Sequence, residues 1–410
     1  MILFFLTSGL FLGWSLGTND ASNIFGSAVG SKMLTFRKAA IIASIGVILG
    51  AVIQGSGTSL TLGQLGAVNA VGGSFTLALA AAITVYSMTK FSMPVSTTQA
   101  IVGAIIGWNI FTGNRTDSAT LTKIVGTWIS GPVVGAIFSI IFYIIINRIK
   151  RKSGIHLVRF ESFIRTGLII AGAFGAYSLG ANNIANVMGV FVPAFKLQEL
   201  NLGLFSLSSN QQLFLLGGLA IAVGIITYSK KVIETVGANI VELSAEAAMV
   251  IVLAQSVVLF IFSSTALSNL LIKTGLPPLP LVPVSSTQVI VGCVVGIGLY
   301  KGIRNINFKL LGQIALGWII TPLVSGLIAF FSLFFMKNIF NIETGYKISD
   351  IKPSDLPIVT PDENLSYIFR YLLLCILILG VIIIGYFILL ERKKNRELRL
   401  SEEKFWKNLK

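Results

Sequence analysis

Long apolar runs separated by short polar stretches make up most of this chain. The runs lie at 39–51, 75–86, 133–146, 214–226, 249–262 and 371–390. Several belong to segments that approach or exceed the roughly 20 residues an α-helix needs to cross a bilayer. None of them alternates between apolar and polar residues, as the strands of a membrane β-barrel do. The pattern therefore predicts an all-α, polytopic transmembrane protein.

Polar motifs interrupt these apolar runs, and each motif occurs twice. The pairs are Gly17–Asn23 with Gly180–Asn186, Pro94–Gln99 with Pro283–Gln288, and Trp128–Pro132 with Trp318–Pro322. Three motifs repeated in the same order indicate an internal duplication. We therefore expect two structural repeats within one chain.

Charged residues are scarce and unevenly spread. Only 11% of the 410 residues are charged, whereas soluble domains carry about 25%. The formal net charge is +15, and its cations gather in short connections of the kind that mark cytoplasmic loops of membrane proteins. No basic module interleaved with aromatic residues accompanies them, so we expect no nucleic-acid partner. Membrane lipid is the expected surrounding.

The motifs and charges together divide the chain into five parts. These are a first inverted repeat at 1–147, a basic cytoplasmic linker at 148–162, a second inverted repeat at 163–336, an extracytoplasmic loop at 337–366, and a final transmembrane helix with a basic tail at 367–410. If each repeat makes three net crossings plus a re-entrant helical hairpin, the repeats have opposite orientations, as in many secondary transporters. We expect a multi-pass protein of the cell's inner (plasma) membrane, with its N-terminus outside and its tail in the cytoplasm.

The two hydroxyl-rich segments, Pro94–Gln99 and Pro283–Gln288, predict an anion site; we call them tip one and tip two. Proline suits the first turn of a helix, and a helix N-terminus carries partial positive charge. Hydroxyls beside the free N–H groups of that turn bind an anion without a formal cation. The candidate anion ligands are Ser96, Thr97, Thr98, Gln99, Ser285, Ser286, Thr287 and Gln288. The alternative is that the hydroxyls only pack helices together.

The two Asn-rich motifs predict a cation site. Glycine is expected to break the helix at Gly17 and Gly180, so that unwound carbonyls and amide oxygens coordinate a hard cation such as sodium. Asp20 adds a carboxylate, and an acid inside a membrane segment indicates a functional site. The candidate sodium ligands are Asp20, Asn23, Asn183, Asn186 and Glu242. The alternative is that glycine and asparagine serve only in packing between helices.

No Lys or Arg falls within these four motifs. A divalent anion entering against the membrane potential costs about 4.6 kcal/mol per 100 mV, at roughly 2.3 kcal/mol per charge. Co-bound cations offset that cost, which favours cation symport over a passive anion channel. We expect neither an enzyme nor a cofactor, because the single histidine lies in the basic linker and both cysteines lie in apolar runs.

The motif sequences also carry a family resemblance. GTNDASNIFGSAVGSKMLT at Gly17–Thr35 resembles the signature of the inorganic phosphate transporter (PiT) family, and GANNIANVMG, PVSTTQAIVG and PVSSTQVIVG are similar to its other repeated motifs. The resemblance covers residues 1 to about 336. It implies a secondary transporter of inorganic phosphate, coupled to sodium in some members and to protons in others, with inverted repeats and often a homodimer.

Carried over by motif, the resemblance implies phosphate binding at both tips and ion or phosphate binding at Asp20, Asn23, Asn183 and Asn186. Gln99 and Gln288 stand where some members have histidine, which removes a titratable group and favours sodium over protons. We therefore expect sodium–phosphate symport by alternating access around a midplane site at the repeat interface. The alternatives are proton-coupled phosphate, metal–phosphate or sulfate uptake by the same fold, and an anion channel.

Overall fold

The structure, a computed structural model, falls into two units, Met1–Thr360 and Pro361–Lys410. It describes residues 2–30, 33–66, 68–91, 95–153, 156–201, 206–229, 244–302, 308–347, 371, 375, 378 and 389. Every element below belongs to the first unit. The candidate ligand Glu242 and nearly all of the predicted final helix lie outside the described residues.

The described elements are almost all helices. In chain order they are α1 (Ile2–Gly30), α2 (Phe36–Gln54), α3 (Ser56–Gly66), α4 (Val71–Lys90), α5 (Thr97–Thr112), α6 (Ser118–Ser153), α7 (Leu157–Met188), β1 (Leu200–Asn201), β2 (Ser206–Leu207), α8 (Ser209–Thr227), α10 (Ala245–Ser263), α11 (Thr265–Lys273), α12 (Ser286–Lys301) and α13 (Phe308–Asn338). The two short strands pair antiparallel. Seven described helices are long and apolar enough to cross a membrane. The predicted all-α, polytopic class is confirmed.

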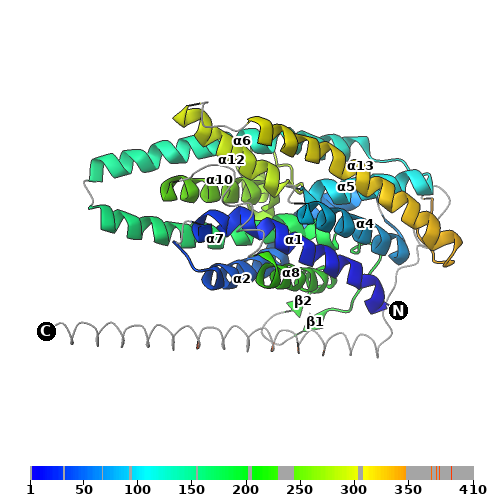
Figure 1. Cartoon of the computed structure of the whole chain (residues 1–410). Helices are drawn as coiled ribbons and strands as arrows, with labels where there is room; N and C mark the ends of the chain where they lie inside the picture. Colours follow the sequence, from blue (N-terminus) through cyan, green and yellow to red (C-terminus); the bar gives the residue numbers. More distant parts are fainter. Residues whose placement is uncertain are drawn as a thin grey trace. The chain divides into compact units, whose positions relative to one another are not determined.

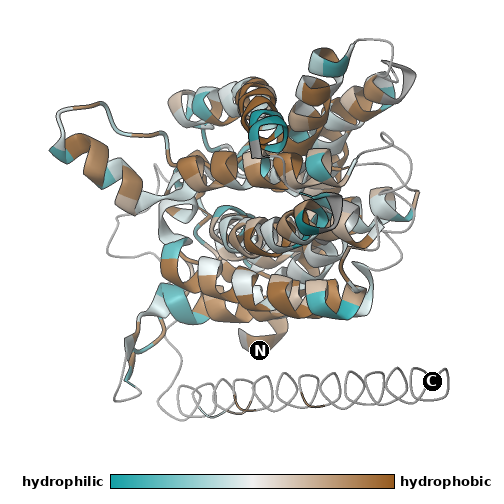
Figure 2. Cartoon of the chain, turned by 90° about the vertical axis from the view of Figure 1, so that its left-hand side faces the viewer, coloured by the Kyte–Doolittle hydropathy of each residue, from teal (hydrophilic) through white to brown (hydrophobic). Residues whose placement is uncertain are grey.

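The helices differ in how much of their surface is buried. In Figure 1, α6 and α13 lie along one edge, α2 and α8 along the opposite edge, and α1 and α7 between them. In the candidate membrane-spanning stretches of α6 and α13, only 28% and 22% of the residues are buried, whereas 72% are buried in that of α4. Hydrophobic residues run along most helices in Figure 2. The exposed apolar side chains of α6 and α13, such as Ile129, Val133, Ile319 and Leu323, suit the hydrocarbon of a bilayer.

The structure corrects the expected helix breaks at Gly17 and Gly180. Helices α1 and α7 are continuous through both glycines. A Cβ atom on Gly17 would lie 2.1 Å from the carbonyl oxygen of Ile221 in α8, and one on Gly180 would lie 2.1 Å from that of Val47 in α2. The glycines therefore allow close helix crossings, and this packing outweighs the roughly 1 kcal/mol that glycine costs in a helix.

The first helices of the two repeats thus make matching contacts, α1 with α8 and α7 with α2. Helices α5 and α12 show the same correspondence. A Cβ atom on Gly103 of α5 would lie 2.1 Å from the carbonyl oxygen of Pro322 in α13, and one on Gly292 of α12 would lie 2.1 Å from that of Pro132 in α6. The duplicated motifs therefore occupy corresponding packing positions. That the repeats are inverted, and that the α4–α5 hairpin is re-entrant, remain predictions.

A short extended segment after α13 closes over the ends of α4 and α5; we call this segment, Asn341–Lys347, the clasp. The indole Nε1 of Trp108 in α5 donates to the Thr344 carbonyl at 2.7 Å. The Asn69 amide pairs with both backbone groups of Tyr346, at 3.0 and 2.9 Å. Gly345 has a φ of +149°, and a Cβ there would lie 2.6 Å from the Trp108 Nε1. The clasp fixes the C-terminal part of α5.

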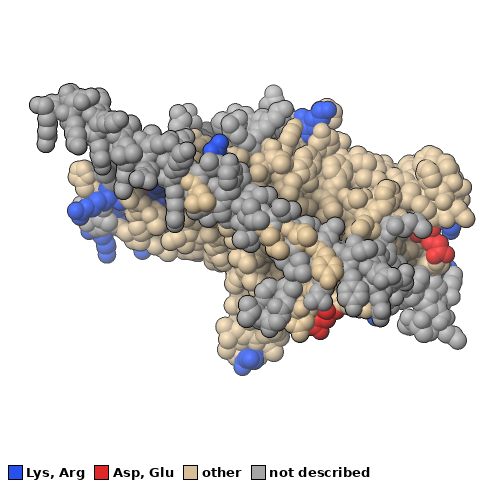
Figure 3. Space-filling model, turned by 90° about the horizontal axis from the view of Figure 1, so that it is seen from below, with Lys and Arg blue, Asp and Glu red and all other residues tan. Residues whose placement is uncertain are grey.

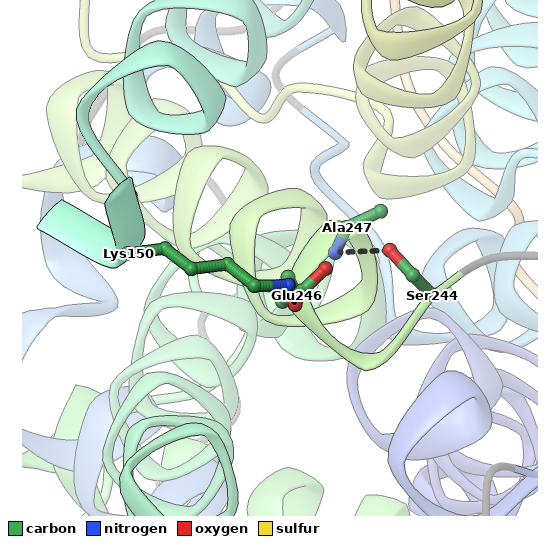
Figure 4. Close-up of polar contacts among 4 residues, drawn as sticks. All are labelled: Lys150, Ser244, Glu246 and Ala247. Atoms are coloured by element: carbon green, nitrogen blue, oxygen red, sulfur yellow. Dashed lines mark hydrogen bonds and ion pairs between the residues drawn. The ribbon is translucent and has the colours of Figure 1, made fainter. Parts of the chain in front are cut away.

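The opposite end of the molecule carries the basic linker. Figure 3 shows several Lys and Arg side chains at the left-hand end, where no Asp or Glu is visible; other cations are spread over the rest of this face, and the visible Asp and Glu lie at the bottom and toward the right. In Figure 4, Lys150 near the end of α6 forms an ion pair with Glu246 in the first turn of α10. Ser244 caps that turn, its hydroxyl oxygen accepting from the Ala247 N–H at 3.4 Å. This grouping is what the positive-inside rule requires of a cytoplasmic end, and the orientation itself stays a prediction.

Candidate functional site

The two Asn-rich motifs and the two tips meet around one buried carboxylate. Asp20, in α1, is 2% exposed. Its Oδ2 accepts hydrogen bonds from the Ser286 hydroxyl at 2.7 Å and from the Asn183 amide at 3.0 Å, and its Oδ1 accepts from the neighbouring Asn19 amide at 2.7 Å. Helices α1, α7 and α12 therefore converge on Asp20, and three donors face it in a region where a lone charge is costly.

Each tip is the capped start of a short helix. The Ser96 hydroxyl oxygen accepts from the Gln99 N–H at 3.2 Å, and Ser285 accepts from the Gln288 N–H at 3.3 Å. Helices α5 and α12 each have 16 residues, fewer than a full crossing needs. Ser96 and Ser285 are therefore N-caps, and the remaining free N–H groups of both first turns lie at the buried centre with the positive ends of two helix dipoles.

The Asn-rich motif of each repeat contacts the tip of the other repeat. The Asn186 amide donates to the Thr98 hydroxyl oxygen at 2.9 Å, and the Asn23 amide donates to the Thr287 hydroxyl oxygen at 3.5 Å. The Thr287 hydroxyl in turn donates to the Val95 carbonyl of tip one at 3.0 Å. These bonds make the site an interface between the repeats.

Several buried acceptor oxygens at this interface have no hydrogen-bond partner. They are Thr97 Oγ1, Gln99 Oε1, Asn186 Oδ1 and Gln288 Oε1. Buried polar atoms are nearly always paired in native proteins, so each unpaired one calls for an explanation such as a ligand. Amide and hydroxyl oxygens are also the donor atoms that hard cations take. The unpartnered set thus fits a ligand that binds at the tips.

The structure places nearly all of the predicted ligands together. The eight tip residues are all buried, at 5% exposure or less, as are Asp20, Asn183 and Asn186, whereas Asn23 is half-buried. Glu242 lies outside the described residues. In the described part of the chain, no three His, Cys, Asp or Glu side chains gather as a metal site would require. The oxygens open to a cation here are therefore those of Asp20, the amides and the hydroxyls.

Two asparagines that were not among the predicted ligands hold the backbone of the tips. Asn182 accepts from the Val284 N–H at 2.9 Å and donates to the Val284 carbonyl at 2.7 Å. Asn19 donates to the Val95 carbonyl at 3.2 Å. The sequence carried one signal for them, since each is the first asparagine of its motif. In the structure, each bonds the valine of the tip in its own repeat.

Comparisons with known proteins show the family to which the chain belongs. A sequence model described as the phosphate transporter family matches residues 16–329. A proposed phosphate permease of Thermococcus kodakarensis is 26% identical, over 80% of this chain and 96% of that protein. One from Methanocaldococcus jannaschii is 27% identical, over 79% and 94%.

A solved structure named "The sodium-dependent phosphate transporter" aligns with a TM-score of 0.64 at 22% identity, over 82% of this chain and 99% of that chain, which shows a shared fold. The family match is the stronger finding for function, because it includes both Asn-rich motifs and both tips. Since it spans well over half of the chain, the chain belongs to the phosphate transporter family.

Proposed function

We propose that this protein imports inorganic phosphate together with sodium, by alternating access around the buried site between the repeats. One observation carries the proposal. Asp20 of the first repeat is bonded by Ser286 at 2.7 Å and by Asn183 at 3.0 Å, both from the second repeat. A change at the acid therefore reaches tip two and both Asn-rich motifs directly, as coupling of two substrates requires.

The tips supply the phosphate half of the site. The first turns of α5 and α12 offer backbone N–H groups and hydroxyls at buried helix N-termini, which is a common geometry for phosphate binding. The unpartnered Thr97 hydroxyl is free to donate to a phosphate oxygen. The four motifs contain no Lys or Arg, so we assign the balancing of the negative charge of phosphate to co-bound cations. Hydroxyls, N–H groups and cations together then replace the water around the anion.

Amide oxygens and Asp20 supply the cation half. Unpartnered carbonyl oxygens attract cations and repel anions, so the Oε1 atoms of Gln99 and Gln288 favour sodium, while their amide N–H groups stay available to phosphate. The name of the structural neighbour, a sodium-dependent phosphate transporter, supports the same ion. Two sodium ions neutralise a divalent phosphate, and a third lets the membrane potential drive uptake.

The test is uptake of radiolabelled phosphate into proteoliposomes, with and without an inward sodium gradient at constant pH. We expect accumulation above equilibrium only with sodium. Accumulation driven by a pH gradient alone would assign the coupling to protons. If unlabelled sulfate inhibited uptake of labelled phosphate as strongly as unlabelled phosphate does, the assignment of phosphate as the specific substrate would be overturned. Flux that never exceeds equilibrium under any gradient would identify a channel.

A further inference from the structure

We propose that Asn182 and Asn19 are positioning residues that hold tip two and tip one, respectively, in their phosphate-binding conformation. We further propose that Asn182 has the larger effect on phosphate binding. This inference rests on the proposed function, because it assigns the tips to phosphate. It concerns two residues whose side chains face the backbone of a tip. Neither was predicted as a ligand from the sequence.

The backbone of Val284 explains why such a residue is needed. Val284 is 0% exposed and lies in a segment that is neither helix nor strand. Its N–H and C=O groups therefore have no secondary-structure partners in a buried part of the protein, where an unpaired backbone group is expensive. The Asn182 side chain carries the same donor and acceptor as a peptide group, and it bonds both. The side chain thus pairs with the Val284 backbone as a neighbouring β-strand would.

Geometry separates this role from direct ligation. One N–H of the Asn182 amide is donated to the Val284 carbonyl at 2.7 Å, and its other bond runs to Asn183 Oδ1 at 2.8 Å. Its Oδ1 accepts from the Val284 N–H. Both N–H donors are thus committed within the protein, so the residue touches the substrate only through the backbone that it holds. The next residue, Ser285, caps α12.

Tip one is held differently. Like Asn182, Asn19 also donates to the residue that follows it, but it makes only one bond to the tip, to the Val95 carbonyl at the longer distance of 3.2 Å. The same carbonyl also accepts from the Thr287 hydroxyl of tip two. Tip one therefore depends on tip two, whereas Asn182 alone pairs both backbone groups of Val284. Loss of Asn182 should consequently disturb both tips.

The experiment compares Asn182→Ala, Asn19→Ala and a matched control, Asn109→Ala, in proteoliposomes. Asn109 is also a buried amide that bonds a backbone carbonyl, that of Leu65 at 3.2 Å, but it lies near the other end of α5. At saturating sodium, we expect the phosphate KM to rise about tenfold for Asn182→Ala, which corresponds to about 1.4 kcal/mol, and about threefold for Asn19→Ala. Asn109→Ala should lower thermal stability and leave the KM unchanged.

The sodium dependence decides between positioning and ligation. A positioning residue leaves the half-saturating sodium concentration within about twofold of wild type. If Asn182→Ala raises that concentration as much as the phosphate KM, the residue is a cation ligand and the proposal is wrong. An unchanged phosphate KM would also overturn it. Asn182→Asp keeps the acceptor for the Val284 N–H but puts a carboxylate oxygen against the Val284 carbonyl and Asn183 Oδ1, and it adds a buried negative charge. We therefore expect its phosphate KM to be at least as high as that of Asn182→Ala.

A labelling measurement tests the same idea without transport. In a Cys375→Ser background, Cys293 is the remaining thiol of the chain, and it is buried in α12, about two turns after the first residue of that helix, Ser286. We expect Asn182→Ala to speed alkylation of Cys293 by a maleimide at least fivefold in detergent, and Asn182→Asp to do so at least as much. Equal labelling rates would overturn the proposal. If wild type failed to accumulate phosphate, the proposed function would fail, while this comparison would still decide whether Asn182 holds α12.

Discussion

The two tips have almost the same sequence and the same local structure, yet they are held by different partners. Ser96 and Ser285 cap their helices at nearly equal distances, 3.2 and 3.3 Å. Asn182 bonds both the N–H and the carbonyl of Val284 in tip two, whereas Asn19 bonds only the carbonyl of Val95 in tip one. Duplication therefore preserves the helix start, and the surrounding side chains decide how firmly each tip is held.

The Asn-rich motifs differ in charge. Position 20 is an aspartate, and the matching position 183 is an asparagine. Asn183 donates to Asp20 at 3.0 Å, so the pair joins the repeats across their interface. Only one of the two motifs thus supplies a carboxylate. This difference makes the site asymmetric in charge.

The largest effect on transport is expected when the charge difference between Asp20 and Asn183 is removed. Asp20→Asn makes both motifs neutral, and the carboxylate that offsets a sodium ion is lost. We expect sodium-driven phosphate uptake to fall at least 100-fold, equivalent to about 2.7 kcal/mol, while the protein still elutes as a folded species in size-exclusion chromatography. The measurement is initial uptake under a sodium gradient. Sodium-driven uptake near the wild-type rate would show that Asp20 does not couple the ions.

A charge swap is the matched control. Asp20→Asn combined with Asn183→Asp keeps the number of carboxylates and moves the acid to the second repeat. We expect no recovery, because Ser286 bonds the side chain at position 20. Recovered uptake would mean that only the net charge of the site matters.

The sequence predicted which residues meet, but it did not predict how they are held. The repeated motifs located Asp20 and both tips, since polar residues inside apolar runs stand out without a structure. The expected helix breaks at Gly17 and Gly180 were wrong, because the close approach of α8 and α2 is a tertiary contact that local propensity does not contain. The role of Asn182 was missed for the same reason, since its partner Val284 is distant in sequence.

The next effect concerns one hydroxyl in each tip. Thr287 donates to the Val95 carbonyl, whereas Thr98 accepts from Asn186. Thr287→Val and Thr98→Val keep the shape and remove the hydroxyl, so both should raise the phosphate KM more than the half-saturating sodium concentration. We expect about tenfold for Thr287→Val and about threefold for Thr98→Val, because only Thr287 also ties the tips together. Equal losses of phosphate and sodium affinity would contradict separate roles.

A smaller effect is expected at the clasp, which holds α5 but has no counterpart on α12 among the described residues. Trp108→Phe removes the donor to the Thr344 carbonyl and leaves a buried acceptor unpaired, at about 1–3 kcal/mol. We expect the apparent melting temperature to fall by a few degrees, with little change in phosphate KM. Trp14→Phe is the matched control: its indole donates to the Thr227 hydroxyl oxygen at 3.0 Å in an exposed setting, so its loss should matter less.

The smallest effect on stability is expected at the basic end, where a partly exposed ion pair between Lys150 and Glu246 joins α6 to α10. Their side chains are 43% and 18% exposed, so water and salt screen the pair, and exposed ion pairs contribute about 0–1 kcal/mol. Lys150→Ala and Glu246→Gln should each shift the melting temperature by about a degree or less, and the double variant should reveal a coupling that fades in 0.5 M salt. A coupling well above 1 kcal/mol that persists in 0.5 M salt would show that solvent screening does not set the strength of this ion pair.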